Sequence, residues 1–129
     1  PDEVTRRLMA LLDSRAEPTS YLTRIPVRER ERVRFVKATD IDWLEASGNY
    51  VVLHAGRESH VLRETLTALE SQLSPRAFLR LSRSAMVNLD RVRQVEPAFN
   101  DEHVVVLVDG TRLPLTRGLR ELQDRLKFS

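Results

Sequence analysis

From Tyr21 onward the chain is divided into short runs of Val, Leu, Ile and aromatic residues, separated by Gly, Asn, Asp or Pro. Residues of the first kind favour β-strands, and those of the second kind favour turns. Seven runs have this character: YLTRIPV, RVRFVKA, IDWLEA, NYVVLHA, VRQVEPA, HVVVLV and TRLPLT. This alternation predicts a mainly β architecture of short strands that are joined by tight turns.

Two of the breaks carry specific turn signals. Asp109-Gly110 lies between two strand-like runs, and these residue types tolerate the positive φ that a two-residue hairpin turn requires. Ser47-Gly48-Asn49 is a second turn candidate. Both signals favour antiparallel neighbours.

Two other segments have helical rather than strand-like spacing. Their regularly spaced leucines are Leu66, Leu69 and Leu73 in the first segment, and Leu119, Leu122 and Leu126 in the second. Thr65 precedes the first segment as a candidate N-cap, and Pro75 follows it. The sequence therefore predicts one internal helix and one C-terminal helix.

Residues 1–20 differ from the rest of the chain. Val4, Leu8 and Leu11 or Leu12 recur at helical spacing, and the sequence EPTS then interrupts the pattern. We interpret residues 1–20 as an N-terminal linker helix and connector, and residues 21–129 as the folded domain.

The bulk composition restricts the possible functions. A length of 129 residues, with 41% hydrophobic and 31% charged residues, is typical of one globular domain. The net charge is only +2, so any basic binding site has to be local. Cysteine is absent, which removes disulfides and thiolate metal sites. No apolar run is long enough to cross a bilayer, and we expect a soluble, cytoplasmic protein.

The sequence does not favour an enzyme. The three histidines lack the spacing of a zinc protease motif, and no glycine-rich loop could bind a phosphate. Ser82 and Ser84 lack the glycines of a nucleophile elbow. Asp40 and Asp42, two apart in a strand-like run, are best explained as a solvated face. We expect no catalytic residue, no metal and no cofactor.

The stretch FLRLSRSAMVN, residues 78–88, places charged and polar residues within a strand-like run. If Leu79 and Leu81 face the core, strand alternation turns Arg80 and Ser82 outward and leaves Arg83 at a rim. An arginine in that position can donate two hydrogen bonds to a guanine edge. A purely solubilising role is the alternative, and for Arg80 taken alone it is the simpler one.

Two further sites can be interpreted either as DNA contacts or as purely structural features. Thr116 can cap the C-terminal helix, whose first N–H groups could then receive a phosphate, with Arg117 beside it. Asn49 at its turn could pair with an adenine edge, and Tyr50 could reach a phosphate. Helix capping, turn formation and strand packing are the structural alternatives.

Four segments in order resemble the LytTR family of bacterial DNA-binding domains: WLEASGNYVVLHA, LRETLTALESQL, FLRLSRSAMVNLDRV and DGTRLPLTRGLREL. The resemblance implies an elongated arrangement of small antiparallel β-sheets that inserts loops into successive major grooves. It also implies binding to paired half-sites as a homodimer. In such proteins a receiver domain usually precedes this one, as part of a two-component response regulator.

Carried over to this sequence, the resemblance assigns roles to individual residues. The base-contacting residues would be Asn49, Tyr50, Arg83 and Arg117. The DNA backbone contacts would come from Arg80, Ser82, Ser84 and Thr116. Asn88 would hold the loop together without touching DNA.

Two alternatives to DNA binding remain open at this point. A β-rich protein-interaction module could recruit a partner through HVVVLV or an edge strand, with the arginines only solvating the rim. A small hydrolase could use Ser82 or Ser84 with a histidine. The predicted function is sequence-specific double-stranded DNA binding for transcription regulation.

Overall fold

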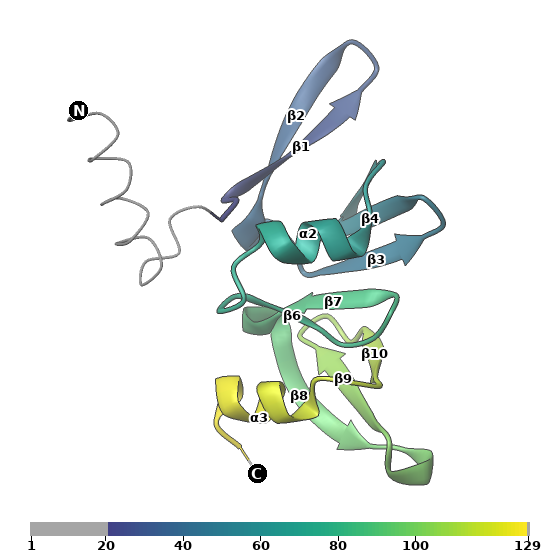
Figure 1. Cartoon of the computed structure of the whole chain (residues 1–129), viewed down its shortest axis with the longest axis vertical. Coiled ribbons are helices and arrows are strands. Elements are labelled where there is room, and N and C mark those ends of the chain that lie inside the picture. Colours follow the sequence, from purple (N-terminus) through teal and green to yellow (C-terminus); the bar gives the residue numbers. More distant parts are fainter. Residues whose placement is uncertain (1–20, 129) are drawn as a thin grey trace, which may run out of the picture.

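The computed structural model describes residues 21–128, and the helix and connector predicted for residues 1–20 lie outside this part. The described part is mainly β and elongated, with three antiparallel sheets and two α-helices arranged along the long axis (Figure 1). No helix within residues 21–128 is long and apolar enough to span a membrane. The predicted fold class is confirmed.

The central sheet has five strands in the order β5-β4-β3-β7-β6. Its strands are β3 (Trp43–Ser47), β4 (Tyr50–Ala55), β5 (Glu58–Leu62), β6 (Phe78–Arg80) and β7 (Ala85–Asn88). The sequence did not predict β5, and it described residues 78–88 as one strand-like run, which the structure divides into β6 and β7. All four residues of β7 are buried, because both faces of this strand are covered, and a strand of that kind has no polar alternation to reveal it. The edge strand β5 buries His60 and exposes Val61, which reverses the expected pattern.

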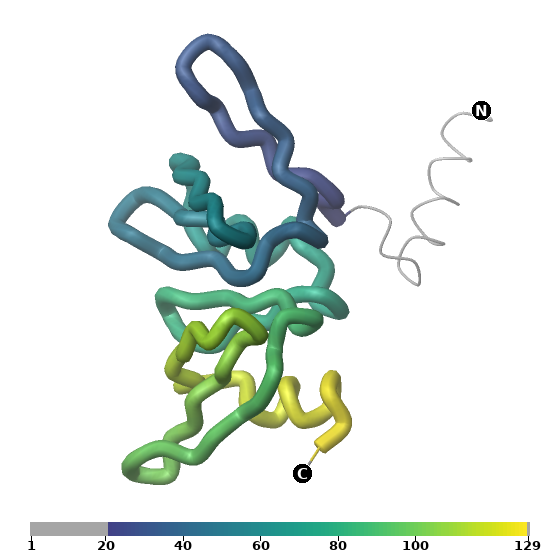
Figure 2. Tube along the Cα trace, turned by 180° about the vertical axis from the view of Figure 1, so that it is seen from behind, coloured from purple at the N-terminus to yellow at the C-terminus, as the bar shows by residue number. Residues whose placement is uncertain are grey.

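Two smaller sheets flank the central one. One is the hairpin of β1 (Arg24–Glu29) and β2 (Arg32–Lys37), which projects from one end of the molecule (Figure 2). The other has the order β10-β9-β8 and consists of β8 (Val92–Pro97), β9 (His103–Leu107) and β10 (Arg112–Leu115). Three short 3-10 helices lie in the connections: η1 (Ala38–Asp40), η2 (Leu89–Arg91) and η3 (Phe99–Asp101).

Both predicted helices are present. Helix α2 (Leu66–Gln72) begins at the N-cap Thr65, whose hydroxyl accepts the Ala68 N–H at 3.0 Å. Helix α3 (Leu119–Leu126) buries Leu122 completely. Each helix packs its leucines against a different face of the central sheet, so the sheet separates two hydrophobic clusters.

The two clusters meet at β7. Met86 belongs to the first cluster, with α2 and the inner face of the β1–β2 hairpin. Val87, its neighbour in sequence, belongs to the second cluster, with α3 and the three-stranded sheet. Since successive side chains of a strand point to opposite faces, one strand joins the two halves of the core.

Both predicted turns connect antiparallel strands. Gly48 and Asn49 join β3 to β4, with Gly48 at φ 61°. The turn after β9 is longer than two residues, because β9 ends at Leu107 and β10 begins at Arg112. In this turn the Thr111 N–H donates to the Asp109 carboxylate at 2.9 Å, and this hydrogen bond holds the pKa of that carboxyl below its usual range.

Candidate nucleic-acid interface

Three turns from distant parts of the sequence lie along one side of the molecule, on the right in Figure 1. They are the β3–β4 turn, the β6–β7 loop and the segment that joins β10 to α3. The β6–β7 loop is the middle one. Its Ser84 carbonyl accepts the Ala46 N–H at 2.9 Å, which ties it to the end of β3 beside the first turn.

The same loop is bonded to the third segment through Leu81. The Leu81 carbonyl accepts the Thr116 N–H at 2.9 Å and the Arg117 N–H at 3.1 Å. The Leu81 side chain is fully buried, so this anchor is part of the second hydrophobic cluster. Backbone hydrogen bonds on a buried anchor therefore hold the three turns in a fixed relation.

The predicted contact residues differ in their exposure. Six of them have exposed side chains: Asn49, Tyr50, Arg83, Ser84, Thr116 and Arg117. Ser82 is half-buried, and its hydroxyl accepts the Ser84 N–H at 3.3 Å. Arg83 and Arg117 are exposed, and backbone hydrogen bonds hold the segments that carry them. Their guanidiniums can therefore bind a ligand at little conformational cost.

The predicted outward orientation of Arg80 is wrong. Its side chain is only 9% exposed, because α2 covers the face of β6 that the alternation rule had left open to solvent. The guanidinium donates to Glu70 Oε1 at 2.8 Å and forms an ion pair with it. It also donates to the carbonyls of Ser82 and Arg83, both at 2.8 Å. Through these hydrogen bonds Arg80 stabilises the loop that carries Arg83.

The predicted capping role of Thr116 is also wrong. The N-cap of α3 is Gly118, at φ 86°, and no side chain caps this helix. The Thr116 hydroxyl instead lies 3.4 Å from the Leu81 carbonyl. A Cβ added at Gly118 would lie 2.9 Å from the Arg80 carbonyl, so glycine is what permits α3 to start this close to β6.

Asn88 has a structural role but does not hold the β6–β7 loop together as predicted, because it lies at the opposite end of β7 from Arg83. Its amide donates to the Ile41 carbonyl at 2.8 Å, and its side-chain oxygen accepts the Asp90 N–H at 3.0 Å. The solvated face predicted for Asp42 is wrong, because Asp42 is buried and pairs with Arg91 at 2.9 Å. Sequence separation hid this pair, since its two members are 49 positions apart.

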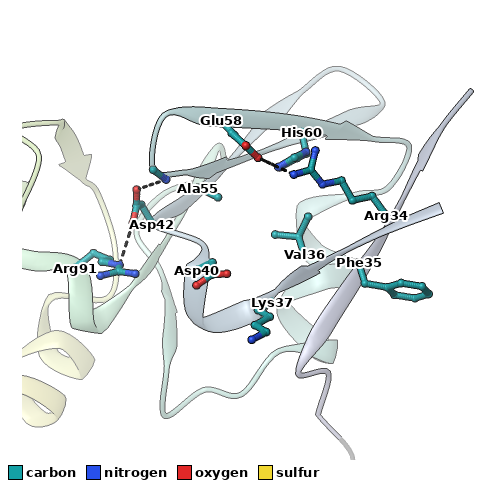
Figure 3. A pocket seen from close by; sticks show the side chains of 11 residues that line it. Arg34, Phe35, Val36, Lys37, Asp40, Asp42, Ala55, Glu58, His60 and Arg91 are labelled. Carbon is teal, nitrogen blue, oxygen red and sulfur yellow. Dashed lines mark hydrogen bonds and ion pairs between the residues drawn. The ribbon is translucent and has the colours of Figure 1, made fainter. Parts of the chain in front are cut away.

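A pocket of about 520 Å³ lies between the β1–β2 hairpin and the end of β4 (Figure 3). Apart from Lys37 and Asp40, the charged groups that line it have protein partners. Asp42 contacts Arg91 and the Gly56 N–H, while Glu58 contacts His60 at 3.2 Å and Arg34 at 3.3 Å. A pocket whose charges are mostly paired within the protein has little left with which to select a charged ligand.

Within residues 21–128 no group of His, Asp and Glu has the geometry of a metal site. The Ser82 and Ser84 hydroxyls face each other at 3.5 Å, and no hydrogen bond in this part of the chain joins either of them to a histidine. The arrangement offers hydrogen-bond donors along an edge and lacks the nucleophile and base contact that a serine hydrolase needs.

A family model described as the LytTr DNA-binding domain matches residues 31–127. The chain belongs to the LytTR family. The match covers the β6–β7 loop, both neighbouring turns and both helices. Membership in a family of DNA-binding domains supports DNA binding, and it favours neither the protein-interaction module nor the hydrolase.

Named bacterial proteins resemble this LytTR chain over most of its length. The sensory transduction protein LytT of Bacillus anthracis is 26% identical over 114 residues, which are 88% of this chain and 46% of the relative. The transcriptional regulatory protein YpdB of Escherichia coli K12 is 33% identical over 105 residues, 78% of this chain and 43% of the relative. The chain thus spans less than half the length of these two curated relatives.

The fold of this LytTR chain has a solved counterpart. The LytTr DNA-binding domain of a putative methyl-accepting/DNA response regulator from Bacillus cereus superposes with a TM-score of 0.71. The superposition covers 83% of this chain and 99% of that domain, at 18% sequence identity. At this identity the likeness concerns the fold alone.

Proposed function

We propose that the chain is the DNA-reading part of a bacterial transcription regulator, the effector domain of a two-component response regulator. Arg83 and Arg117 read base edges in the major groove, together with Asn49 and Tyr50 of the β3–β4 turn. Ser82, Ser84 and Thr116 contact the phosphates beside them. A receiver domain precedes this part in the whole protein, and two copies bind paired half-sites as a homodimer. We expect such a regulator in the cytoplasm.

One observation carries the proposal. Three exposed turns, each with a predicted base-reading residue, are hydrogen-bonded to one another through Leu81 and Ser84. A rigid row of donors that projects from a protein edge fits the major groove, where each base pair presents its own pattern of donors and acceptors. The exposed guanidiniums can bind guanine O6 and N7 bidentately, which discriminates by ~1–3 kcal/mol per base.

Arg80 has a different role in this proposal from the one its sequence position predicts. Its guanidinium is occupied by Glu70 and by two loop carbonyls, so we assign it to positioning Arg83 rather than to contacting a phosphate. No metal, cofactor or covalent chemistry enters this function.

Selection from a pool of random duplexes tests the proposal. A covalently linked dimer of the chain should enrich a pair of short half-sites at regular spacing, because linkage raises the effective concentration of the second domain. Dimers that carry Arg83→Ala or Arg117→Ala should lose preference at particular base positions, a different one for each variant. A dimer with Arg125→Ala, at the far end of α3, is the matched control and should select the wild-type sequence.

A flat pool with folded wild-type protein would contradict the proposal. The row of turns would then be better explained as a protein-interaction surface, and partner binding unaffected by Arg83→Ala would support that explanation.

A further inference from the structure

The positive charge of the chain is concentrated in the β1–β2 hairpin. Residues 24–37 contain six Arg or Lys and two Glu, a net charge of +4, whereas the whole chain carries only +2. The rest of the protein is therefore net negative. None of the three turns described above belongs to this hairpin, so its charge has no part in the proposed base reading.

Some of the hairpin arginines have acidic partners and others do not. Arg32 pairs with Glu29 at 3.5 Å, and Arg34 with Glu58 at 3.3 Å. Arg28 and Arg30 are exposed and form no ion pair with any residue of the described range 21–128. Arg30 lies at the hairpin tip with φ 49°. These two guanidiniums are available to a ligand.

Arg28 and Arg30 also line a groove of about 590 Å³ whose opposite wall comes from the central sheet. That wall contains the exposed Arg63 and Tyr50, and Glu64 is the one carboxylate among the lining residues. Tyr50 is the first residue of β4, directly after the β3–β4 turn. The groove therefore runs from the hairpin to the edge at which the proposed base readers lie.

The position of the hairpin extends that edge. It projects along the long axis beyond the central sheet, with its tip on the same side as the β3–β4 turn (Figure 1). DNA that follows the row of turns would pass the groove next. The three guanidiniums around this groove can each bind the oxygens of a phosphodiester backbone bidentately.

We propose that Arg28, Arg30 and Arg63 form a backbone-binding arm that contacts DNA phosphates outside the base pairs read by the three turns. The inference rests on the proposed function and adds to it a longer footprint on one side. The arm contributes affinity without sequence preference, because phosphates carry no base information.

Two duplexes test the arm. The short one ends at the base pairs read by the β3–β4 turn. These base pairs are the positions at which the Asn49→Ala variant loses its base preference in the selection experiment. The long one adds about 10 bp of arbitrary sequence on that side, one helical turn. Fluorescence anisotropy at several salt concentrations should show tighter binding and a steeper salt dependence of wild-type protein on the long duplex.

The double variant Arg28→Ala/Arg30→Ala should bind the long duplex severalfold more weakly. Its slope of log affinity against log salt should be shallower by about 2, one for each lost phosphate contact. Its affinity for the short duplex and its base preferences should match those of wild type. The control Arg76→Ala/Arg125→Ala removes the same charge from two exposed arginines that belong neither to the groove nor to the three turns, and it should behave as wild type on both duplexes.

Ethylation of single phosphates gives an independent readout. Modified phosphates in the added flank should weaken wild-type binding and have no effect on the double variant. Suppose that wild type binds the short duplex specifically, and that the double variant and wild type have the same affinity for the long duplex. The arm is then refuted and the proposed function stands. If wild type binds neither duplex, both fail. An equal loss on both duplexes would assign the two arginines elsewhere and would also refute the arm.

Discussion

Arg80 and Arg83 are three positions apart and have opposite environments. Arg80 is buried and makes four hydrogen bonds to protein groups, whereas Arg83 is exposed. The buried arginine bonds the backbone carbonyl of the exposed one, so one residue fixes the position from which the other acts. At the residue scale the site is therefore a pair of arginines with separate tasks.

Replacement of each arginine should separate stability from binding. Arg80→Ala should lower the free energy of unfolding by about 2–3 kcal/mol, because the carbonyls of Ser82 and Arg83 lose a charged donor. Arg83→Ala should change it by less than about 0.5 kcal/mol, as is usual for an exposed residue, while weakening DNA binding. Urea denaturation measures the first effect and anisotropy the second. Equal stability of the two variants would exclude the supporting role of Arg80.

At the scale of single elements, the two threonines that precede helices are not equivalent. Thr65 accepts a hydrogen bond from the Ala68 N–H at the start of α2, whereas Thr116 is separated from α3 by two residues and caps nothing. The same residue type before a leucine-spaced segment therefore has two structural outcomes.

Thr65→Ala should cost about 1 kcal/mol of unfolding free energy, because it removes the acceptor of an N-terminal N–H group. Thr116→Ala is the matched control and should cost less than half of that in urea denaturation. A cost at Thr116 as large as at Thr65 would mean that its hydroxyl does cap α3.

Gly118 and Gly48 both have positive φ, which costs a residue with a side chain roughly 1–2 kcal/mol. Only Gly118 has a neighbour in the way, the Arg80 carbonyl at 2.9 Å from an added Cβ, while Gly48 has nothing within 4 Å. Gly118→Ala should therefore lower the melting temperature more than Gly48→Ala does. It should also weaken DNA binding, since it displaces the segment that carries Arg117. Equal melting temperatures would contradict the close approach of α3 to β6.

At the scale of the whole molecule, two hydrophobic clusters share one strand. Strand β7 contributes Met86 to the first cluster and Val87 to the second. If either half loses its packing, β7 is no longer held in place, and the other half loses a strand of its own core. An elongated protein of this construction is expected to unfold in one cooperative step.

Leu69→Ala in the first cluster and Leu107→Ala in the second should each cost about 2–5 kcal/mol, because both leucines are almost fully buried. Trp43, the single tryptophan, packs against the second cluster and reports on it by fluorescence. Its transition should coincide with that of far-ultraviolet circular dichroism in both variants. A Leu69→Ala variant whose circular dichroism changes before its fluorescence would indicate two independent halves.

The sequence by itself determined the elements whose signals lie within a short stretch of the chain. Both helices, the Thr65 cap, the β3–β4 turn and most strands follow from spacing and turn chemistry within about ten residues, and the family motif follows from their order. The tertiary structure alone decided which polar residues face solvent. Arg80 is buried because α2 packs over it, and Asp42 is buried beside Arg91, which lies 49 positions further along the chain. Alternation along a strand specifies two faces, but only packing against the rest of the chain decides whether either face meets water.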